Sequence, residues 1–445
     1  MDKKLEIVSQ EYCDEETKEK LDEISQLEGV KEIVSFPDSS LVSGLTPKSS
    51  VIKTKDVIYP EFGSVANNCG MGVIKTDLNS EDITKQKIKE FGKKIKAKKV
   101  NPDFRVDKER AKNIFLEGVE YTSKYSEVIS PENVENRGNM FSSHNRYFEI
   151  NQVIPKIILD KFLDRNPYFP IKGNHFIELQ AIDSIADENM ASKWGLEEKQ
   201  VLISIHGGYS LNNVLNYLYV NRSEIEKKDI LERTSSKIAK LWFLMSKSNS
   251  LKDFKNRANL IFDNEPFTPF YTDTKEGKRM IDCLNLGMNY AYGLRSLFYS
   301  HLSEIVSDVF GTTEMNLLWD CSHDSIQKEN GNWLSRKGVC KINNNNPSII
   351  SGSYNFNSCI VAGGKNREKY LNSHDHGCGN LIDLVENEVK KSKETATRFN
   401  LNTTKTNEVQ IMRNKPIKEL VNILKEKEIL KPVVWSKPIA NYKKY

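Results

Sequence analysis

Five of the seven histidines lie in short segments rich in Gly, Asn or Asp, where the backbone can turn tightly and approach a ligand closely. These segments, with one cysteine in a similar turn, are 67–72, 173–175, 206–208, 320–324 and 374–379. One thiolate with several imidazoles suits a borderline divalent ion such as Zn or Mn better than Ca or Mg. No local spacing such as His-Glu-x-x-His joins these residues, so a metal site and a set of unrelated turn histidines both stay open on spacing alone.

The elements that must position these residues alternate between strand clusters and helical stretches. Short β-rich runs with Ser, Gly and Pro between them are predicted over 30–75, 174–183, 201–208 and 316–380. Helical periodicity dominates 81–165 and 211–310, and the tail from Pro416 predicts one helix and a short terminal strand. We therefore predict one α+β domain over 1–445, with mixed β-sheets carrying the active site and long helices packed outside. Within it, 1–29 is a polar lead-in and 211–310 a helical insertion.

Composition sets only broad limits on function. The 65 basic and 61 acidic residues leave a net charge of +4, which neither requires nor excludes nucleic acid, because a local basic groove is what binds phosphate. The charged first residues lack the apolar core of a signal peptide, and no run reaches the roughly 18 apolar residues of a membrane helix. Seven cysteines without a close Cys-x-x-Cys pair are typical of a reducing compartment. We expect a cytoplasmic protein that has no membrane partner.

A series of motifs carries a resemblance to a known family. In chain order they are 66–70 (ANNCG), 173–178 (GNHFIE), 206–210 (HGGYS), 320–324 (DCSHD), 336–338 (RKG), 351–354 (SGSY), Ser358, 375–380 (DHGCGN) and 437–443 (KPIANYK). In this order they resemble the motifs of the RtcB-type RNA ligases, from about residue 30 to 443. The resemblance covers nearly the whole chain.

The resemblance implies a metal centre and a histidine nucleophile. Such ligases hold two Mn ions with a cysteine, three histidines and an aspartate, which here implies the ligands Cys69, His175, His206 and His323. Their nucleophile corresponds to His376, which would attack the α-phosphate of GTP, expel pyrophosphate and form a phosphoramidate. The guanylate would then pass to an RNA 3′-phosphate, and a 5′-hydroxyl would displace GMP to seal the strand. The implied cofactors are GTP and one or two Mn ions, with Zn as the alternative metal.

Further roles follow from the same resemblance. The residues expected to bind GTP are Asn174, Ser353, Ser358, Gly377, Cys378, Gly379 and Lys443. Candidate contacts to RNA phosphates are Arg295, Arg336 and Lys337, since guanidinium and ammonium groups neutralise the RNA backbone. The alternative for these three and for Lys443 is ordinary solvated charge, and for His376 it is a hydrogen-bonded turn histidine.

The sequence departs from the family at several motif positions. The family's metal-binding aspartate is Ala66, the histidine before Arg-Lys-Gly is Ser335, and the arginine closing the nucleophile motif is Asn380. The Asp-Val-His turn is kept only in part, from Asp38. In return, the family's asparagine after the last metal histidine is Asp324. We hypothesise that Asp324 supplies the lost carboxylate to the metals; a one-metal enzyme is the alternative.

Three functions are carried forward. The first is a GTP- and Mn-dependent RNA ligase that joins 3′-phosphate or 2′,3′-cyclic phosphate ends to 5′-hydroxyl ends, in RNA repair or in splicing and tRNA processing. The second is a metal-dependent RNA-end phosphoesterase, and the third an inactive RNA-end binding paralogue. The departures favour a divergent paralogue in RNA repair. Because some family members need a helper, an activator protein is a further expected partner, whereas the RNA substrate and the oligomeric state stay open.

Overall fold

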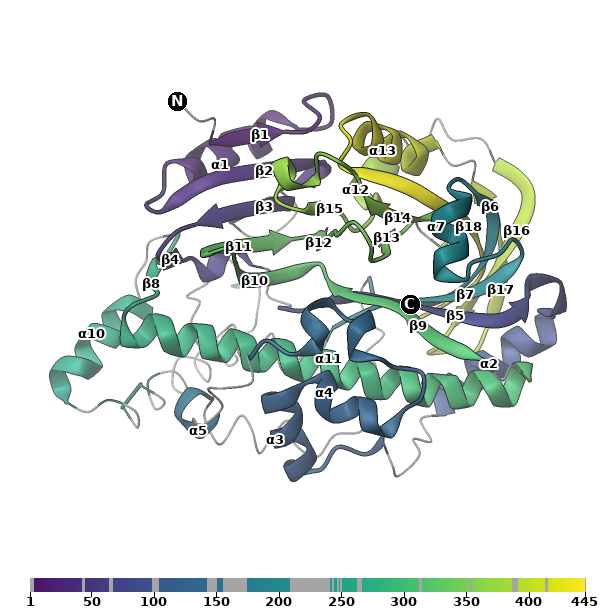
Figure 1. Ribbon diagram of the computed structural model, residues 1–445, viewed down its shortest axis with the longest axis horizontal. Helices are drawn as coiled ribbons and strands as arrows, with labels where there is room; N and C mark the ends of the chain where they lie inside the picture. Colours follow the sequence, from purple (N-terminus) through teal and green to yellow (C-terminus); the bar gives the residue numbers. More distant parts are fainter. Residues whose placement is uncertain are drawn as a thin grey trace.

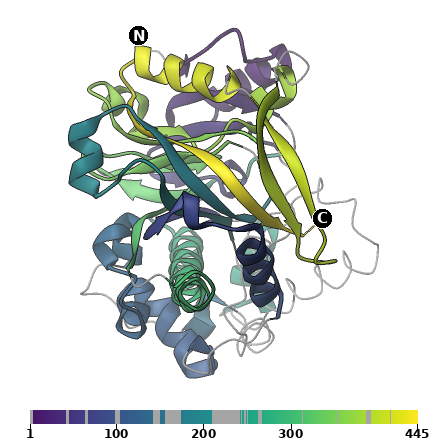
Figure 2. The ribbon, with the colours of Figure 1, turned by 90° about the vertical axis from the view of Figure 1, so that its right-hand side faces the viewer.

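The computed structural model describes residues 4–41, 45–63, 67–97, 104–141, 150–154, 174–208, 241, 244–245, 248, 250–261, 266–311, 314–352, 354–385, 391–412 and 415–444. Figure 1 shows the β-sheets in the upper part of the molecule and the long helix α11 (Lys275–Phe310) beneath them. Helices α3 (Lys108–Glu117) and α4 (Val119–Thr122) lie on the far side of α11, which Figure 2 shows nearly end-on. Sheets and helices pack as mixed layers, so the predicted α+β fold class is confirmed.

The larger sheet has nine strands, and its order is β13-β14-β18-β6-β7-β5-β9, with β16 and β17 attached through β18. The strands are β5 (Gly70–Asn79), β6 (Phe176–Ile185), β7 (Gln200–Gly207), β9 (Met315–Ser322), β13 (Ser348–Ile350), β14 (Ser358–Gly363), β16 (Lys391–Asn400), β17 (Thr406–Met412) and β18 (Leu430–Lys443). All paired neighbours are antiparallel except β16 and β18. The starts of β5 and β6 therefore lie beside the ends of β7 and β9.

The second sheet has the order β1-β2-β3-β11-β10. Its strands are β1 (Leu5–Ile7), β2 (Val30–Ser40), β3 (Lys48–Thr54), β10 (Asp324–Glu329) and β11 (Asn332–Lys337). Two small pairs complete the β-structure: β12 (Val339–Lys341) with β15 (Ser373–Asp375), and β4 (Val57–Ile58) with β8 (Phe270–Tyr271). Asn330 and Gly331 join β10 to β11 with φ of 47° and 79°, as a two-residue hairpin turn with two positive φ angles requires.

Helix α11 is the central helix of the fold. The Thr274 hydroxyl caps its first turn by accepting from the Gly277 N–H, and Gly311, with a φ of 79°, ends it. Every residue from 286 to 302 is buried, because the nine-stranded sheet covers one side of the helix and α3 and α4 cover the other. The other helices are α1 (Glu15–Ser25), α2 (Lys85–Ala97), α5 (Ile150–Val153), α7 (Glu188–Trp194), α10 (Leu251–Ile261), α12 (Gly379–Val385) and α13 (Lys415–Glu426), with the 3-10 helices η1 (Pro60–Phe62), η2 (Ser80–Asp82), η4 (Ser123–Tyr125), η5 (Pro131–Asn133), η6 (Glu135–Gly138) and η8 (Arg367–Tyr370).

Most predicted elements appear at the expected places. The structure contains strands in all four predicted strand regions: 30–75, 174–183, 201–208 and 316–380. The predicted terminal helix and terminal strand are also present. The sequence analysis missed β1 in the polar lead-in and the β16–β17 hairpin. Residues 155–165 and 211–240 of the predicted helical stretches lie outside the described residues. Among the described helices, none combines the length and the apolar character that a membrane crossing needs.

Candidate metal centre and nucleotide site

The four predicted metal ligands meet at one end of the nine-stranded sheet. Cys69 directly precedes β5, His175 directly precedes β6, His206 is the next-to-last residue of β7, and His323 follows β9. Because β5 pairs with both β7 and β9, and β6 pairs with β7, the antiparallel register brings these positions together. Strand ends on a rigid sheet hold the side chains in place, although more than 250 residues separate the first from the last.

The donor atoms lie close enough to share metal ions. The Cys69 Sγ is 3.3 Å from Nε2 of His175 and 3.5 Å from Nε2 of His206, and the latter nitrogen is 3.0 Å from Nε2 of His323. Two groups have all their ligand atoms within 4.8 Å of one another: Cys69, His175 and His206, and His206, His323 and His376. His206 belongs to both groups. The site therefore has the donors for one ion, or for two neighbouring ions bridged by shared ligands.

The side chains of the cluster shift one another's pKa values. Burial alone would raise the pKa of Cys69, but the neighbouring His323, His206 and His175 hold that pKa well below its usual range. Burial would likewise lower the pKa of His323, whereas Asp324 and the Cys69 thiolate raise it well above its usual range. In the metal-free site protonated imidazole thus balances the thiolate; a divalent ion would displace that proton and take over this role, and one thiolate with several imidazoles fits Mn or Zn.

His376 completes the cluster from the other side. Its ring stacks on that of His323, with centroids 4.2 Å apart and planes 13° apart. Its Nδ1 lies 2.7 Å from the carbonyl oxygen of Gly338, so Nδ1 carries the hydrogen and the Nε2 lone pair stays available. Burial, with His323 and His206 nearby, holds the pKa of His376 well below its usual range, and the ring is therefore neutral at pH 7. A neutral imidazole with a free Nε2 can act as a nucleophile or as a ligand.

The fifth histidine singled out from the sequence does not join this cluster. His374 is fully buried, with Nδ1 2.7 Å from the Asp375 carbonyl oxygen and Nε2 2.7 Å from the Ser348 hydroxyl. Burial lowers its pKa to about 4, so it is a neutral histidine whose ring nitrogens both have partners. It holds β15 against β13.

Asp324 supports a ligand and lies apart from the cluster itself. One carboxylate oxygen lies 3.4 Å from Nδ1 of His323, the ring nitrogen that faces away from the other donors, and its second oxygen accepts from the Gly338 N–H at 2.9 Å. A carboxylate behind a ligand histidine orients the ring and raises its basicity. The expectation that Asp324 is itself a ligand does not fit this geometry. Ala66, where the family has its aspartate, lies outside the described residues.

Arg295 holds the turn that carries the cysteine. Its guanidinium forms two bonds to Asp320, at 2.9 and 2.6 Å, and donates to the carbonyl oxygen and the side-chain oxygen of Asn68 at 2.8 and 3.1 Å. Asn68 has a φ of 60°, an uncommon conformation that these bonds stabilise directly before Cys69. Arg295 is fully buried, so the predicted contact with an RNA phosphate was wrong.

The two other predicted RNA contacts differ from each other. Arg336 is also fully buried, where it pairs with Glu329 at 2.6 Å and donates to the Ser373 hydroxyl at 2.9 Å, so a phosphate contact does not fit here either. Both arginines are buried because each has a carboxylate partner that sequence spacing does not reveal. Lys337 is half-buried and donates to the Thr46 carbonyl oxygen, and it stays a candidate.

Of the predicted GTP-binding residues, Asn174 and Gly377 lie directly beside the cluster. Asn174 is exposed, and its carbonyl oxygen lies 3.2 Å from Nδ1 of His206. Gly377 bridges to Ser351, whose N–H donates to the carbonyl oxygen of His376 at 2.9 Å. Cys378 is fully buried, and its Sγ lies 3.7 Å from the Ser351 carbonyl oxygen. Gly379 begins α12, and Ser353 lies outside the described residues.

A buried polar network that the sequence analysis did not assign lies beside these residues. Gln180 donates to the Glu178 carboxylate at 2.6 Å and to the Ser358 hydroxyl at 2.8 Å, and Asn441 donates to Glu178 at 3.3 Å. Burial raises the pKa of Glu178 to about 7. Lys443 is half-buried two residues after Asn441, and burial together with the charge of Arg398 lowers its pKa. The available signal was a polar pair, Glu178 and Gln180, within the otherwise apolar run 176–182.

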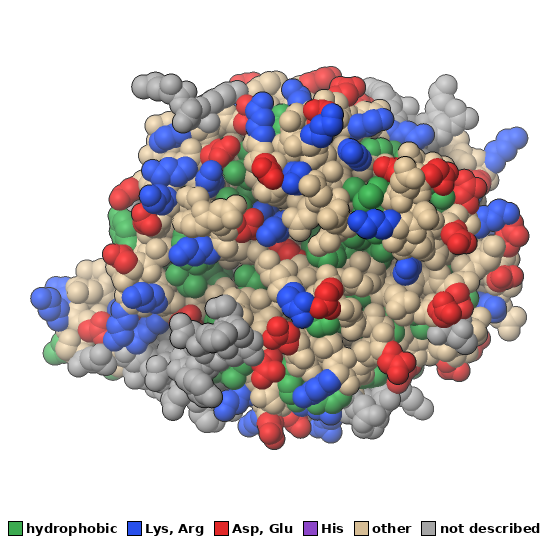
Figure 3. Space-filling view, in the orientation of Figure 1, with side chains coloured by type: hydrophobic (Ala, Val, Ile, Leu, Met, Phe, Trp, Pro, Cys, Tyr) green, Lys and Arg blue, Asp and Glu red, His purple; other side chains and the backbone are tan. Residues whose placement is uncertain are grey.

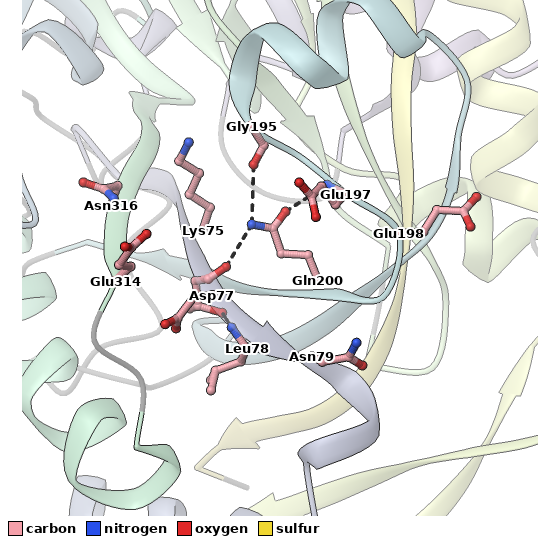
Figure 4. Close-up of a pocket in the computed structure, with 11 residues that line it drawn as sticks. Lys75, Asp77, Leu78, Asn79, Gly195, Glu197, Glu198, Gln200, Glu314 and Asn316 are labelled. Atoms are coloured by element: carbon pink, nitrogen blue, oxygen red, sulfur yellow. Dashed lines mark hydrogen bonds between the residues drawn. The ribbon is translucent and has the colours of Figure 1, made fainter.

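A pocket of about 390 Å³ lies at the end of β5, β7 and β9 that is opposite the candidate metal centre. Figure 4 shows its carboxylates, with Lys75 of β5 among them. Its described lining residues are Lys75, Thr76, Asp77, Leu78, Asn79, Gly195, Glu197, Glu198, Gln200, Glu314 and Asn316, which include no cysteine or histidine. It therefore does not belong to the metal centre.

Comparison with known proteins identifies the family of this chain. The family model described as "tRNA-splicing ligase RtcB" matches residues 20–444. A protein of that name from Methanococcus maripaludis is 23% identical over 366 residues, which cover 74% of this chain and 68% of the relative. A relative with the same name from Thermococcus kodakarensis is 22% identical over 89% of this chain and 83% of its own length, whereas the match to one from Methanopyrus kandleri spans only 27% of that protein. The chain belongs to the RtcB family.

Proposed function

We propose that this chain is an RNA ligase that uses GTP and Mn to join 3′-phosphate or 2′,3′-cyclic phosphate ends to 5′-hydroxyl ends. The observation that carries the proposal is the position of His376, whose ring stacks on a ligand histidine of the metal centre. Relatives named as tRNA-splicing ligases support RNA as the substrate. The low identity supports a divergent member that acts in RNA repair or splicing.

The first chemical step falls to His376. With Nδ1–H donating to the Gly338 carbonyl oxygen, Nε2 attacks the α-phosphorus of GTP, an N–P bond forms, and the bond to pyrophosphate breaks. The guanylate then passes to the RNA 3′-phosphate, which restores the imidazole. Attack by a 5′-hydroxyl expels GMP and forms the phosphodiester. The low pKa of His376 supports this role, because only the neutral ring is nucleophilic.

The metal donors are proposed to be Cys69, His175, His206 and His323. A bound divalent ion, Mn with Zn as the alternative, supplies charge neutralisation at the phosphates and alignment for in-line attack. Asp324 is assigned to orienting His323, and Arg295 to holding the turn before Cys69.

The nucleotide is proposed to lie against the residues around the cluster. Asn174 faces the phosphate from an exposed turn, and Lys443 at the end of β18 faces the base. The hydroxyl of Ser358 and the backbone of 377–379 complete this surface, together with Ser353. Lys337 is proposed as a contact to an RNA phosphate.

A second candidate has an observation of its own. His376 lies within the three-histidine group formed with His206 and His323, so it could serve as a metal ligand instead of a nucleophile. The chain would then be a metal-dependent RNA-end phosphoesterase that opens the cyclic phosphate with water and forms no covalent guanylate.

Mass spectrometry of the intact protein after incubation with GTP and Mn separates these functions. The ligase predicts one acid-labile guanylate per chain, absent from His376→Ala and retained in His301→Gln, a matched change at a buried histidine on α11. Turnover of a cyclic phosphate without the adduct indicates the phosphoesterase. Absence of both signals, with RNA ends still bound, indicates an inactive binding paralogue.

Two expectations about context belong to the same proposal. The elements are proposed to form one ligase domain over 1–445, and the seven cysteines, all buried and none in a disulfide, suit a reducing compartment such as the cytoplasm. The need for an activator protein is decided by counting ligations per enzyme: many turnovers by the isolated chain would show that it needs none.

A further inference from the structure

Helix α2 (Lys85–Ala97) has one apolar side and is otherwise strongly basic. Ile88, Phe91, Gly92 and Ile95 are its buried residues, at the spacing of a single helix face. The remaining positions include six lysines and one glutamate: Lys85, Lys87, Lys89, Glu90, Lys93, Lys94 and Lys96. The helix alone thus has a larger net positive charge than the +4 of the whole chain, so positive charge is concentrated here.

This helix packs beside the end of the strand that leads to the candidate nucleotide site. The hydroxyl of Tyr442 on β18 donates to the Ile88 carbonyl oxygen at 3.1 Å, and its ring lies 5.0 Å from that of Phe91. Tyr442 pairs with Ile177, which is two residues after His175, and the next residue is Lys443. Figure 2 shows α2 next to the chain end of β18. The buried side of α2 therefore packs on the strand that ends at Lys443, a residue expected at the nucleotide site.

Three of the lysines are available to a ligand. Lys85 pairs with Glu408 at 3.4 Å, Lys94 pairs with Asp308, and Lys96 donates to the Asn402 carbonyl oxygen at 2.7 Å. Lys87, Lys89 and Lys93 form no ion pair with any residue that the structure describes. Lys89 and Lys93 are exposed and Lys87 is half-buried.

The surroundings of α2 favour a nucleic-acid strand over a membrane as the partner of its lysines. A basic amphipathic helix can lie on a membrane only if its apolar side is free. Here that side is covered: Phe91 packs on Phe310 and Tyr442, and Gly92 lies so close to Phe399 that a Cβ would meet its ring at 2.7 Å. Lys89 and Lys93 are four residues apart and lie on one exposed side of the helix, where flexible ammonium groups match the charge of an RNA backbone without base specificity.

We propose that Lys89 and Lys93 of α2 contact phosphates of the RNA strand whose end lies in the metal centre. This inference rests on the proposed RNA substrate. The surface on α2 lies outside the family motifs of the protein sequence. It would add affinity for RNA without distinguishing one RNA sequence from another.

The test compares two double variants of the full chain. Lys89→Gln/Lys93→Gln removes two charges from α2, and Lys425→Gln/Lys427→Gln removes two exposed charges at α13, on the opposite side of the molecule. Fluorescence anisotropy with a labelled single-stranded RNA bearing a 3′-phosphate gives Kd between low and high salt. Thermal unfolding of each variant checks that the fold is intact.

The α2 variant should bind about tenfold more weakly near physiological salt, and the salt dependence of log K should fall by about 1.4, at about 0.7 for each phosphate contact to a single strand. The α13 variant should match the unaltered chain. Equal losses in both variants, or none in the α2 variant while the unaltered chain binds RNA, would overturn the α2 surface alone. If the unaltered chain neither binds RNA nor forms the guanylate adduct, the proposed function falls with it.

Discussion

Replacing Arg295 with methionine tests whether this residue holds the turn before Cys69, a role that does not depend on any bound ligand. The change keeps the volume of the side chain but removes two bonds to Asp320 and two to Asn68. Asp320 is 2% exposed, so its carboxylate would be left buried without a compensating charge. Breaking a buried ion pair in this way costs about 3 to 5 kcal/mol of unfolding free energy.

Urea denaturation of the metal-free protein, followed by tryptophan fluorescence, measures this cost. The matched control is Arg137→Met, which removes an ion pair to Glu132 whose side chains are 57% and 59% exposed and which should cost about 1 kcal/mol or less. The double variant Arg295→Met/Asp320→Asn should recover part of the loss, because it removes the uncompensated charge. An Arg295→Met cost no greater than that of the control would refute the assignment of Arg295 as the residue that holds the Cys69 turn.

The other predictions concern the metal centre and the buried network. His206→Ala should abolish binding at both metal positions, since His206 belongs to both ligand groups; titration with Co²⁺ would detect any site that survives. Asp324→Asn should leave the number of bound metal ions unchanged but weaken affinity by about 10- to 100-fold, as expected for a residue behind a ligand; loss of one ion per chain would restore Asp324 as a ligand. The folded-state pKa of Glu178 is raised from 4.5 to about 7, so its contribution to stability is largest below pH 4.5 and is lost as pH rises to 7. Relative to Glu178→Gln, the unaltered chain should therefore lose about 3 kcal/mol between these pH values, and a pH-independent difference would contradict the shift.

The candidate residues of the centre could be picked out from the sequence because each lies in a short motif of its own, whereas their convergence was implied only by the family resemblance. Cys69, His175, His206 and His323 each lie at a turn beside a strand, and the order of their motifs supplied the convergence that single histidines cannot show. His374 shows the limit of this reasoning: it lies in the same Gly-rich segment as His376, yet its ring faces Ser348 instead of the cluster. Residues two apart on a strand point the same way, but the chain leaves β15 before His376.

The roles of the charged residues could not be predicted in this way. From sequence alone, a charged residue is expected to face solvent or a phosphate group. Its burial becomes evident only when the structure shows a partner of opposite charge that is distant in the chain. Arg295 meets Asn68 across 227 positions, and neither spacing nor periodicity encodes that contact. Arg336 lies opposite Ser325 in the β10–β11 hairpin, yet its side chain reaches Glu329 beside the turn, a contact that the strand spacing does not reveal. The β16–β17 hairpin was missed because its exposed strands are polar on most positions and carry no alternating apolar pattern.

Anomalous diffraction from crystals grown with Mn would test most directly whether side chains from four strands form a metal centre beside His376. We expect a peak within bonding distance of the Cys69 Sγ and of Nε2 of His175 and His206, with any second peak at His323. Mn bound only at the acidic pocket beside Lys75, or no peak at the strand ends, would contradict this metal centre.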